Sequence, residues 1–510
     1  MLNATPFLRL YAQWRRGKLS SLQPAATQEQ ELLRLVQKAA TTKFGKDHGF
    51  RSIRSVTDFQ RQVPLRRYEQ FWEEYLKPVF PVLKDQTWPG TVPYFAVSSG
   101  TSSGTTKYIP VTDEMNASNK RAGLDLLVHH LTNCPKSQIF AGRSFILGGS
   151  TDLTEQSPGI WSGDLSGIAV KTLPWWAAAR YFPPPELALL KNWEEKIEIL
   201  ARGSLEQELR MVSGVPSWML ILFGRLAELR PDLPKRIASW YPNLEMLVHG
   251  GVNFAPYYDE FKSLLEGSRA ELREVYPASE GFIAVGDRGF GDGLRMVLDH
   301  GIFYEFVPVT ELDSPTPTRH WIGNIEPDTN YAIVLTTCAG LWSYVIGDTV
   351  RFVDTKTPRL LITGRTSYYL SAFGEHLIAE EIEDGVSSAA RSIGASIEDY
   401  SVGAVFPKKA GELGGHLYVI EFKDPAQART RLPEFIAALD AQLCKRNEDY
   451  EAHRAKGFGL KDPEILIAPP GTFSRWMKKR GKLGGQNKVP RIITKQELFD
   501  DLTGFVREVP

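Results

Sequence analysis

The sequence has only three cysteines in 510 residues: Cys134, Cys338 and Cys444. Their odd number and wide spacing give neither a disulfide framework nor a zinc-binding pattern, so free thiols in a reducing compartment are expected. The long apolar run of a signal peptide is missing, and so is any apolar stretch long enough to cross a bilayer. These absences predict a cytoplasmic protein without a membrane partner.

An excess of charge of either sign is also missing. Lysine plus arginine and aspartate plus glutamate both number 60, which gives a net charge of zero. Proteins that bind nucleic acids concentrate positive charge, and no nucleic-acid partner is therefore expected. The apolar content of 42% is ordinary for a globular protein, and the length predicts two or three domains. The oligomeric state does not follow from these numbers.

One short segment concentrates glycines, hydroxyl groups and a lysine. It reads SSGTSSGTTKYIP over Ser98–Pro110 and follows the apolar run Tyr94–Val97. Glycines let backbone N–H groups turn toward an anion, and Lys107 adds a positive charge, so the segment favours a nucleotide triphosphate. The spacing of a P-loop is absent, which argues against the P-loop NTPase fold. A flexible linker is the alternative, but the strand-like segments on both sides are an odd place for one.

Helix-like and strand-like segments alternate after this loop and predict an α/β sheet domain. A break near Gly364-Arg365-Thr366 predicts a large N-terminal domain (1–365) and a smaller α+β domain (366–510). The tail Trp476–Arg491 is rich in Lys, Arg and Gly, which is typical of a solvated loop. The segments expected to be helical are 27–80 for the most part, 192–202, 216–229, 379–390 and 433–454. Strands are expected at 145–147, 244–248, 301–309, 331–336, 401–406, 416–422 and 464–468.

Three further motifs place glycines beside polar or aromatic residues. The first, His249–Phe254 (HGGVNF), follows an apolar strand, where glycines let a planar ligand approach the backbone; a plain tight turn is the alternative. In Tyr276–Gly281 (YPASEG) a ring, a hydroxyl and a carboxylate lie within one loop, where the carboxylate could hold Mg²⁺ or be solvated. In Trp342–Arg351 (WSYVIGDTVR), Asp348 could accept both ribose hydroxyls or stabilise a hairpin turn.

In this order the motifs resemble the adenylate-forming superfamily and, more closely, the Gretchen Hagen family of auxin-responsive acyl acid amido synthetases. The matching family patterns are Ser-Ser-Gly-Thr-Ser-x-Gly-x-x-Lys (98–107), Tyr-x-x-Ser-Glu (276–280), aromatic-Glu-Phe-x-Pro (304–308) and Gly-Leu-aromatic-x-Tyr-x-x-Gly-Asp (340–348). The similarity extends from about residue 98 to 491. It implies an α/β fold of the adenylate-forming type, with a large N-terminal adenylation domain and a mobile C-terminal lid.

The resemblance also implies the residues that bind ATP and Mg²⁺. Those implied around the triphosphate are Ser98, Ser99, Thr101, Ser102 and Lys107. Those implied around the nucleoside are Gly250 and Gly251 lining the adenine slot, Tyr276 flanking the base, and Asp348 and Arg365 on the ribose. Ser279 would touch the α-phosphate, Glu280 would hold Mg²⁺, and Lys488 would contact the attacking carboxylate and the α-phosphate. The hinge-adjacent loop would be Gly374–Leu377, with Glu380 and Glu381 after it.

The implied activity is ATP-dependent adenylation of a carboxylic acid followed by transfer of the acyl group to an amino acid amine. Lys107, Lys488 and Mg²⁺ would stabilise negative charge, and no covalent nucleophile is needed. An acyl-CoA ligase or a non-catalytic binding protein with the same fold are the alternatives. Plant members tend to carry Arg where this chain has Ser343 and Val345, which leaves the acid open. Tryptophans at 161, 175, 176 and 218 are candidates for the acyl pocket or for the core.

Overall fold

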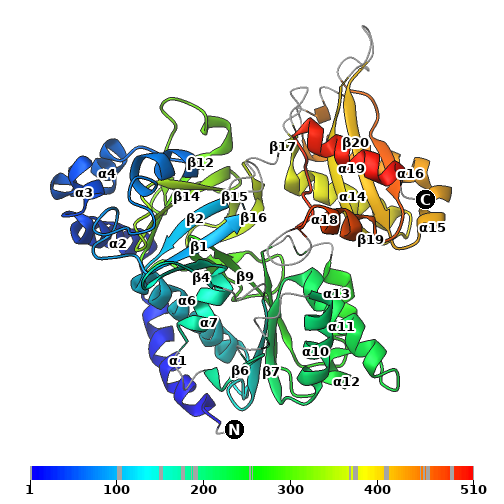
Figure 1. The fold of residues 1–510 in the computed structure, drawn as a ribbon, viewed down its shortest axis with the longest axis horizontal. Coiled ribbons are helices and arrows are strands. Elements are labelled where there is room, and N and C mark those ends of the chain that lie inside the picture. Colours follow the sequence, from blue (N-terminus) through cyan, green and yellow to red (C-terminus); the bar gives the residue numbers. More distant parts are fainter. Residues whose placement is uncertain are drawn as a thin grey trace. The chain divides into compact units, whose positions relative to one another are not determined.

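A computed structural model describes residues 3–99, 106–148, 153–173, 178–184, 187, 193–251, 254, 257–366, 369–370, 377–406, 413–447, 450–451, 454, 460–482 and 488–508. The chain divides into two compact units (Figure 1). The first unit holds most of the chain up to Ile362. The second begins at Thr363 and also includes the short segment Gly347–Thr349. The division lies three residues before the boundary expected at 365.

The first unit is built on a mixed sheet in which the described residues form twelve strands. The neighbouring strands β9, β8, β7, β3 and β6 pair parallel with one another. Strand β9 pairs antiparallel with β10, so the sheet changes from parallel to antiparallel at β9. The order is β13 (His320–Trp321), β12 (Ile302–Pro308), β14 (Asn330–Thr337), β15 (Tyr344–Asp354), β16 (Arg359–Arg365), β11 (Leu294–Met296), β10 (Gly281–Val285), β9 (Glu271–Ala278), β8 (Met246–Gly250), β7 (Leu209–Gly214), β3 (Arg143–Leu147) and β6 (Tyr181–Phe182).

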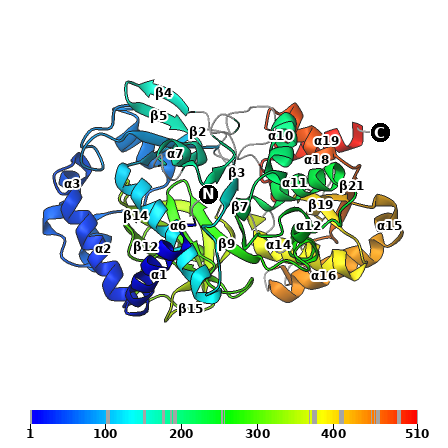
Figure 2. The ribbon, with the colours of Figure 1, turned by 90° about the horizontal axis from the view of Figure 1, so that it is seen from below.

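Helices cover both faces of the parallel part, as its continuous apolar strands require. Leu247 of β8 packs with α10 (Trp193–Leu205), α11 (Pro216–Leu229) and α13 (Tyr258–Leu264). Its neighbours Met246 and Val248 point to the other face and pack with α1 (Thr5–Ser20) and α6 (Asp113–Asn133). Figure 2 shows these helices on the two sides of the strands. Helix α6 begins where the Thr112 hydroxyl accepts a hydrogen bond from the Met115 N–H.

A second, four-stranded sheet carries the Ser/Gly segment. Its order is β2 (Thr106–Val111), β1 (Tyr94–Ser99), β5 (Ile160–Gly163) and β4 (Leu153–Ser157). A large aromatic core joins these strands to the antiparallel part of the long sheet. The remaining helices of this unit are α2 (Pro24–Ala39), α3 (Lys43–Asp47), η1 (Phe50–Ser52), α4 (Val56–Gln62), α5 (Tyr68–Phe71), η2 (Trp72–Leu76), α7 (Leu165–Lys171), α12 (Ile237–Trp240) and η4 (Val309–Glu311).

The second unit is a small α+β domain with its own core. A three-stranded sheet, β19 (Ile397–Val405), β20 (Gly415–Phe422) and β21 (Glu464–Ala468), carries apolar side chains on both faces. Its other described elements are β17 (Tyr369–Leu370), β18 (Leu377–Ile378), α14 (Ala379–Ser392), α15 (Pro425–Thr430), α16 (Leu432–Arg446), α18 (Thr472–Lys479) and α19 (Gln496–Glu508).

The expected pattern of helices and strands is largely confirmed, with two corrections. The predicted loop over Trp476–Arg491 is wrong at its start, because Trp476 lies in α18 and is completely buried. The helix expected over 433–454 is interrupted, since α16 ends at Arg446 and the described residues 450, 451 and 454 are again helical. All three cysteines are free, although only Cys338 is fully buried. Among the described residues, no helix is long and apolar enough to cross a membrane.

Candidate active site

The carboxyl end of β8 meets β9 where the long sheet stops being parallel. Gly250 lies opposite Val275 in the ladder, and a Cβ at Gly250 would come within 2.3 Å of the Val275 carbonyl oxygen. The next residue, Gly251, has a φ of +80°. Both positions therefore need glycine, and they leave bare backbone at an edge where open α/β sheets bind ligands.

The Tyr276–Glu280 motif forms the hairpin between β9 and β10. Ala278 pairs with Gly281, so that Ser279 and Glu280 make a two-residue turn. Both turn residues are half-buried, whereas Tyr276 is only 5% exposed and packs in the aromatic core. The hairpin thus brings a hydroxyl and a carboxylate to the strand next to Gly250. A single carboxylate suits Mg²⁺, which usually takes most of its remaining ligands from water and phosphate.

Two polar residues to which the sequence analysis assigned no role lie beside this edge. His249 of β8 is opposite Glu274 of β9, so both side chains project from the same face of the sheet. His249 is 1% exposed, stacks on Phe254 at 3.6 Å between ring centroids, and its Nδ1 has no hydrogen-bond partner among the described residues. Burial lowers the pKa of His249 to about 3 and raises the pKa of Glu274 to about 7. The sequence signal that could have found His249 and Glu274 is a titratable residue within an apolar strand.

The Ser/Gly segment begins in β1 and ends in β2, two strands that pair antiparallel. The backbone of Ser98 lies opposite Lys107, and that of Ser99 opposite Thr106. The Lys107 ammonium lies 5.3 Å from the ring centroid of Tyr68, whose hydroxyl accepts a hydrogen bond from the Tyr108 N–H. Thr101 and Ser102 lie outside the described residues. The structure therefore brings Ser98, Ser99 and Lys107 to the same end of this strand pair.

Asp348, Arg365 and Lys488 come together within the second unit. Arg365 Nε lies 2.9 Å from Asp348 Oδ1. Lys488 has an exposed side chain, but the protein atoms around it reduce its hydration and lower its pKa to about 8. The negative charge of Asp348 opposes this shift, whereas the positive charge of Arg365 adds to it. The charges of Asp348 and Arg365 thus both act on Lys488, although separate motifs implied the three residues.

The Glu305 motif is structural. Glu305 is completely buried, and its two carboxylate oxygens accept hydrogen bonds from Arg319 Nε and Nη2 at 2.9 and 3.0 Å. The Ser343 hydroxyl donates a further bond to Glu305 at 3.0 Å. Ser343 has a φ of +43°, an uncommon conformation for a residue with a side chain. Ser343 is therefore part of this buried ion-pair network.

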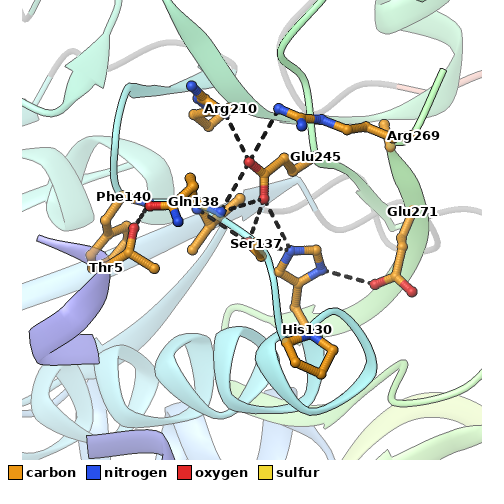
Figure 3. Close-up of polar contacts among 12 residues, drawn as sticks. Thr5, His130, Ser137, Gln138, Phe140, Arg210, Glu245, Arg269 and Glu271 are labelled. Atoms are coloured by element: carbon orange, nitrogen blue, oxygen red, sulfur yellow. Dashed lines mark hydrogen bonds and ion pairs between the residues drawn. The ribbon is translucent and has the colours of Figure 1, made fainter. Parts of the chain in front are cut away.

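Another polar cluster lies at the opposite ends of the parallel strands (Figure 3). Glu245, just before β8, accepts hydrogen bonds from the Gln138 N–H at 2.9 Å and from Arg210 Nη1 at 2.9 Å. Burial alone would raise the pKa of Glu245, but these bonds and those from His130 and Ser137 lower it to about 2. Glu271 is likewise held by His130 Nδ1 at 2.8 Å. These groups satisfy one another, so the cluster joins α6 to the sheet.

Three family models match the chain. The GH3 family N-terminal domain matches residues 18–270, the central domain 295–365 and the C-terminal domain 380–497. The chain belongs to the GH3 family. Strand β8 and the Ser/Gly segment lie within the part matched by the N-terminal model, whereas β9 and its turn lie between the N-terminal and central matches. Arg365 is the last residue of the central match, and Lys488 lies in the C-terminal one.

The curated relatives are plant proteins at low identity. Indole-3-acetic acid-amido synthetase GH3.8 of Oryza sativa subsp. indica is 24% identical over 337 residues, covering 59% of this chain and 54% of the relative. The protein of the same name numbered GH3.3 from Arabidopsis thaliana is 22% identical over 336 residues, covering 60% and 55%. The chain spans about half the length of the curated relatives it matches.

Solved structures show the same fold. The GH3.15 acyl acid amido synthetase matches with a TM-score of 0.79 at 16% identity, covering 99% of this chain and 97% of that one. A 2-hydroxyisobutyryl-CoA ligase in the postadenylation state matches with a TM-score of 0.61 at 14% identity, covering 95% and 92%. This member of the GH3 family therefore has the α/β architecture of the adenylate-forming ligases.

Proposed function

We propose that this GH3 family member uses ATP to activate a carboxylic acid and then joins the acyl group to an amino acid amine. In the first step a carboxylate oxygen attacks the α-phosphorus and pyrophosphate leaves. In the second step the amine attacks the acyl carbonyl and AMP leaves. The observation that supports this most directly is the β8–β9 edge, where Gly250 and Gly251 expose backbone next to the Tyr276–Glu280 hairpin.

In this proposal the first unit binds the nucleotide. Gly250 and Gly251 would line the adenine slot, and Tyr276 would flank the base. The Nδ1 of His249, which has no hydrogen-bond partner among the described residues, and the steric need for glycine at 250 fit a planar, hydrogen-bonding ligand at this edge. The residues proposed to contact the phosphates are Ser98, Ser99, Thr101, Ser102, Lys107 and Ser279. Glu280 would hold Mg²⁺, which would neutralise charge on the phosphate oxygens.

The second unit would act as the mobile lid and supply the remaining contacts. Asp348 would accept both ribose hydroxyls, with Arg365 Nε 2.9 Å from its carboxylate. Lys488 would contact the attacking carboxylate and the α-phosphate, two groups whose like charges repel each other. A cation aimed at developing negative charge lowers the barrier most in a water-poor site.

ATP–pyrophosphate exchange tests the first step. Purified protein with ATP, Mg²⁺ and a panel of aryl and alkyl carboxylic acids should incorporate labelled pyrophosphate into ATP with at least one acid. Lys488→Ala should lower that exchange by about 100-fold or more. Lys495→Ala, an exposed lysine of the same unit, is the matched control and should leave it unchanged. The absence of exchange across the whole panel would rule out the adenylation step.

Product analysis separates the amide from the alternatives. With a competent acid, an amino acid panel should give an amide detectable by mass spectrometry together with AMP. An acyl-CoA ligase, whose fold is shared here, would instead release AMP only with CoA and form a thioester. A non-catalytic binding protein would bind ATP without either product.

A further inference from the structure

Helix α1 exposes a stripe of large apolar side chains. Phe7, Leu10 and Trp14 are 71%, 67% and 60% exposed. Their spacing of three and four residues places all three on one face of the helix. Single exposed apolar residues are ordinary on protein surfaces, but a contiguous apolar patch marks an interaction surface. Figures 1 and 2 both show α1 (dark blue) at the surface of the first unit.

The opposite face of α1 is firmly attached to the first unit. Leu8 and Ala12 are buried against α6 in a common cluster. All three guanidinium nitrogens of Arg15 donate hydrogen bonds. They reach both carboxylate oxygens of Asp125 at 2.7 Å and both of Asp299 at 2.6 and 2.8 Å. The Phe140 N–H also donates to the Thr5 hydroxyl at 3.0 Å (Figure 3). The stripe is therefore displayed by a fixed helix.

Positive charge surrounds the stripe. Residues 1–28 contain no aspartate or glutamate, and besides the ion-paired Arg15 they contain Arg9, Arg16 and Lys18, although the whole chain is neutral. Arg16 and Lys18 are exposed, and the Lys18 ammonium lies 5.4 Å from the ring centroid of Trp14. Exposed Trp, Phe and Leu next to basic residues are typical of helices that lie in the interface of an anionic membrane.

We propose that α1 docks the protein on the surface of a membrane that contains anionic lipids. Phe7, Leu10 and Trp14 enter the boundary between headgroups and acyl chains, while Arg16 and Lys18 contact lipid phosphates. A helix that lies on a membrane surface differs from a segment that spans the membrane. The expectation of no membrane partner was based on the absence of spanning segments. A second copy of the chain fits the surface less well, because pairing two α1 helices brings like charges together without any acidic residue of this segment to offset them.

Vesicle sedimentation of the full-length protein tests the proposal. One set of vesicles contains phosphatidylcholine only, and the other contains 30% phosphatidylglycerol. Binding should be roughly 30-fold tighter to the anionic vesicles, as about 1 kcal/mol for each of two cations predicts. Leu10→Ser/Trp14→Ser and Arg16→Gln/Lys18→Gln should each reduce this binding by at least tenfold. The matched control is Ile221→Ser/Val353→Ser, which changes two apolar residues that are 49% and 46% exposed elsewhere in the first unit.

Three results would overturn the proposal. The first is a protein that sediments with neither set of vesicles. The second is binding that the α1 variants retain while circular dichroism shows all proteins folded. The third is a dimer, measured by light scattering, that Leu10→Ser/Trp14→Ser converts to a monomer, since this result would make a second copy the occupant. Quenching of Trp14 fluorescence by brominated lipid, lost in Trp14→Phe, would support insertion of the stripe.

Discussion

Arg365 Nε and Asp348 Oδ1 lie 2.9 Å apart, at the end of β16 and within β15. The Asp348 side chain is 19% exposed and the Arg365 side chain 41%. A carboxylate that is fixed before its ligand arrives loses little further freedom on binding. In the proposed function this pair would accept the two hydroxyl groups of a ribose.

Asp348→Asn should raise the KM for ATP by about tenfold to 100-fold, because hydrogen bonds to a charged acceptor contribute about 1.5–3 kcal/mol. The amide side chain can accept at only one atom and carries no charge for Arg365. Pyrophosphate exchange at varied ATP concentrations measures the change. Asp354→Asn, on the same strand, should leave KM within twofold. An unchanged KM in Asp348→Asn would remove Asp348 from the nucleotide site.

Reaction rates should fall above pH 8 because Lys488 loses its charge there. Reduced hydration lowers the pKa of Lys488 to about 8, so the ammonium is present below this pH and lost above it. The value of kcat/KM for adenylation should therefore decrease tenfold per pH unit on the alkaline side. Lys488→Arg, which stays charged, should be slower but free of this decrease up to pH 10. An alkaline decrease that persists in Lys488→Arg would assign it to another group.

Gly250→Ala should disrupt the β8–β9 edge. The added Cβ would lie 2.3 Å from the Val275 carbonyl oxygen, too close for any backbone to accept without moving. We expect a loss of about 2 kcal/mol or more in the free energy of unfolding and a large loss of ATP binding. Gly224→Ala in α11 is the control, since nothing lies within 4 Å of its Cβ position. That substitution should be neutral or stabilise by up to about 1 kcal/mol.

The stability of the protein should decrease between about pH 4.5 and 7 through Glu274. Burial raises its pKa from 4.5 to about 7, so in this range the unfolded chain ionises while the folded protein keeps the proton. The free energy of unfolding therefore falls with rising pH, by at most about 3 kcal/mol. Glu274→Gln should remove this contribution, and urea unfolding at pH 5 and pH 7.5 measures it. Equal pH dependence in both proteins would contradict the assignment.

Glu305→Ala should destabilise the first unit by about 3–5 kcal/mol, because it leaves Arg319 buried without its counter-charge. The variant should unfold at a clearly lower urea concentration than the wild-type protein. Glu73→Ala is a suitable comparison, since Glu73 pairs with Lys77 on the surface and is 60% exposed. Its cost should stay below about 1 kcal/mol. Similar midpoints for the two variants would show that the buried pair contributes little.

Local sequence patterns predicted most elements because each one contains its own signal. Helix α11 begins at Pro216, a favoured first residue, and β21 is a short run of apolar residues; both have the expected bounds. The strand expected at 244–248 lies two residues further along the chain as β8, and the one expected at 301–309 is one residue shorter at each end as β12. Trp476 was misplaced because the charges of its neighbours suggested a loop, whereas α18 buries one face and leaves those charges in water.

The candidate site was predicted as a set of motifs, but their arrangement was not. Gly250 and Tyr276 are separated by 25 residues in the chain, and only the parallel pairing of β8 with β9 makes them neighbours. The roles of Glu305 and Ser343 were hidden for the same reason, since a buried ion pair with Arg319 leaves no local signal. His249 and Glu274 lie in apolar strands, and only the register of β8 against β9 shows that the two residues are neighbours.

The amino-acid sequence by itself determined the family, the chemistry of its loops and the approximate position of several helices and strands. These features depend on residues within a few positions of one another, where backbone sterics and hydrophobic periodicity act directly. The tertiary structure decided which polar groups are buried, which pKa values shift and which apolar face of α1 stays in contact with water. Those properties arise from atoms that are distant in the chain, because hydration and electrostatic interaction depend on distance in space.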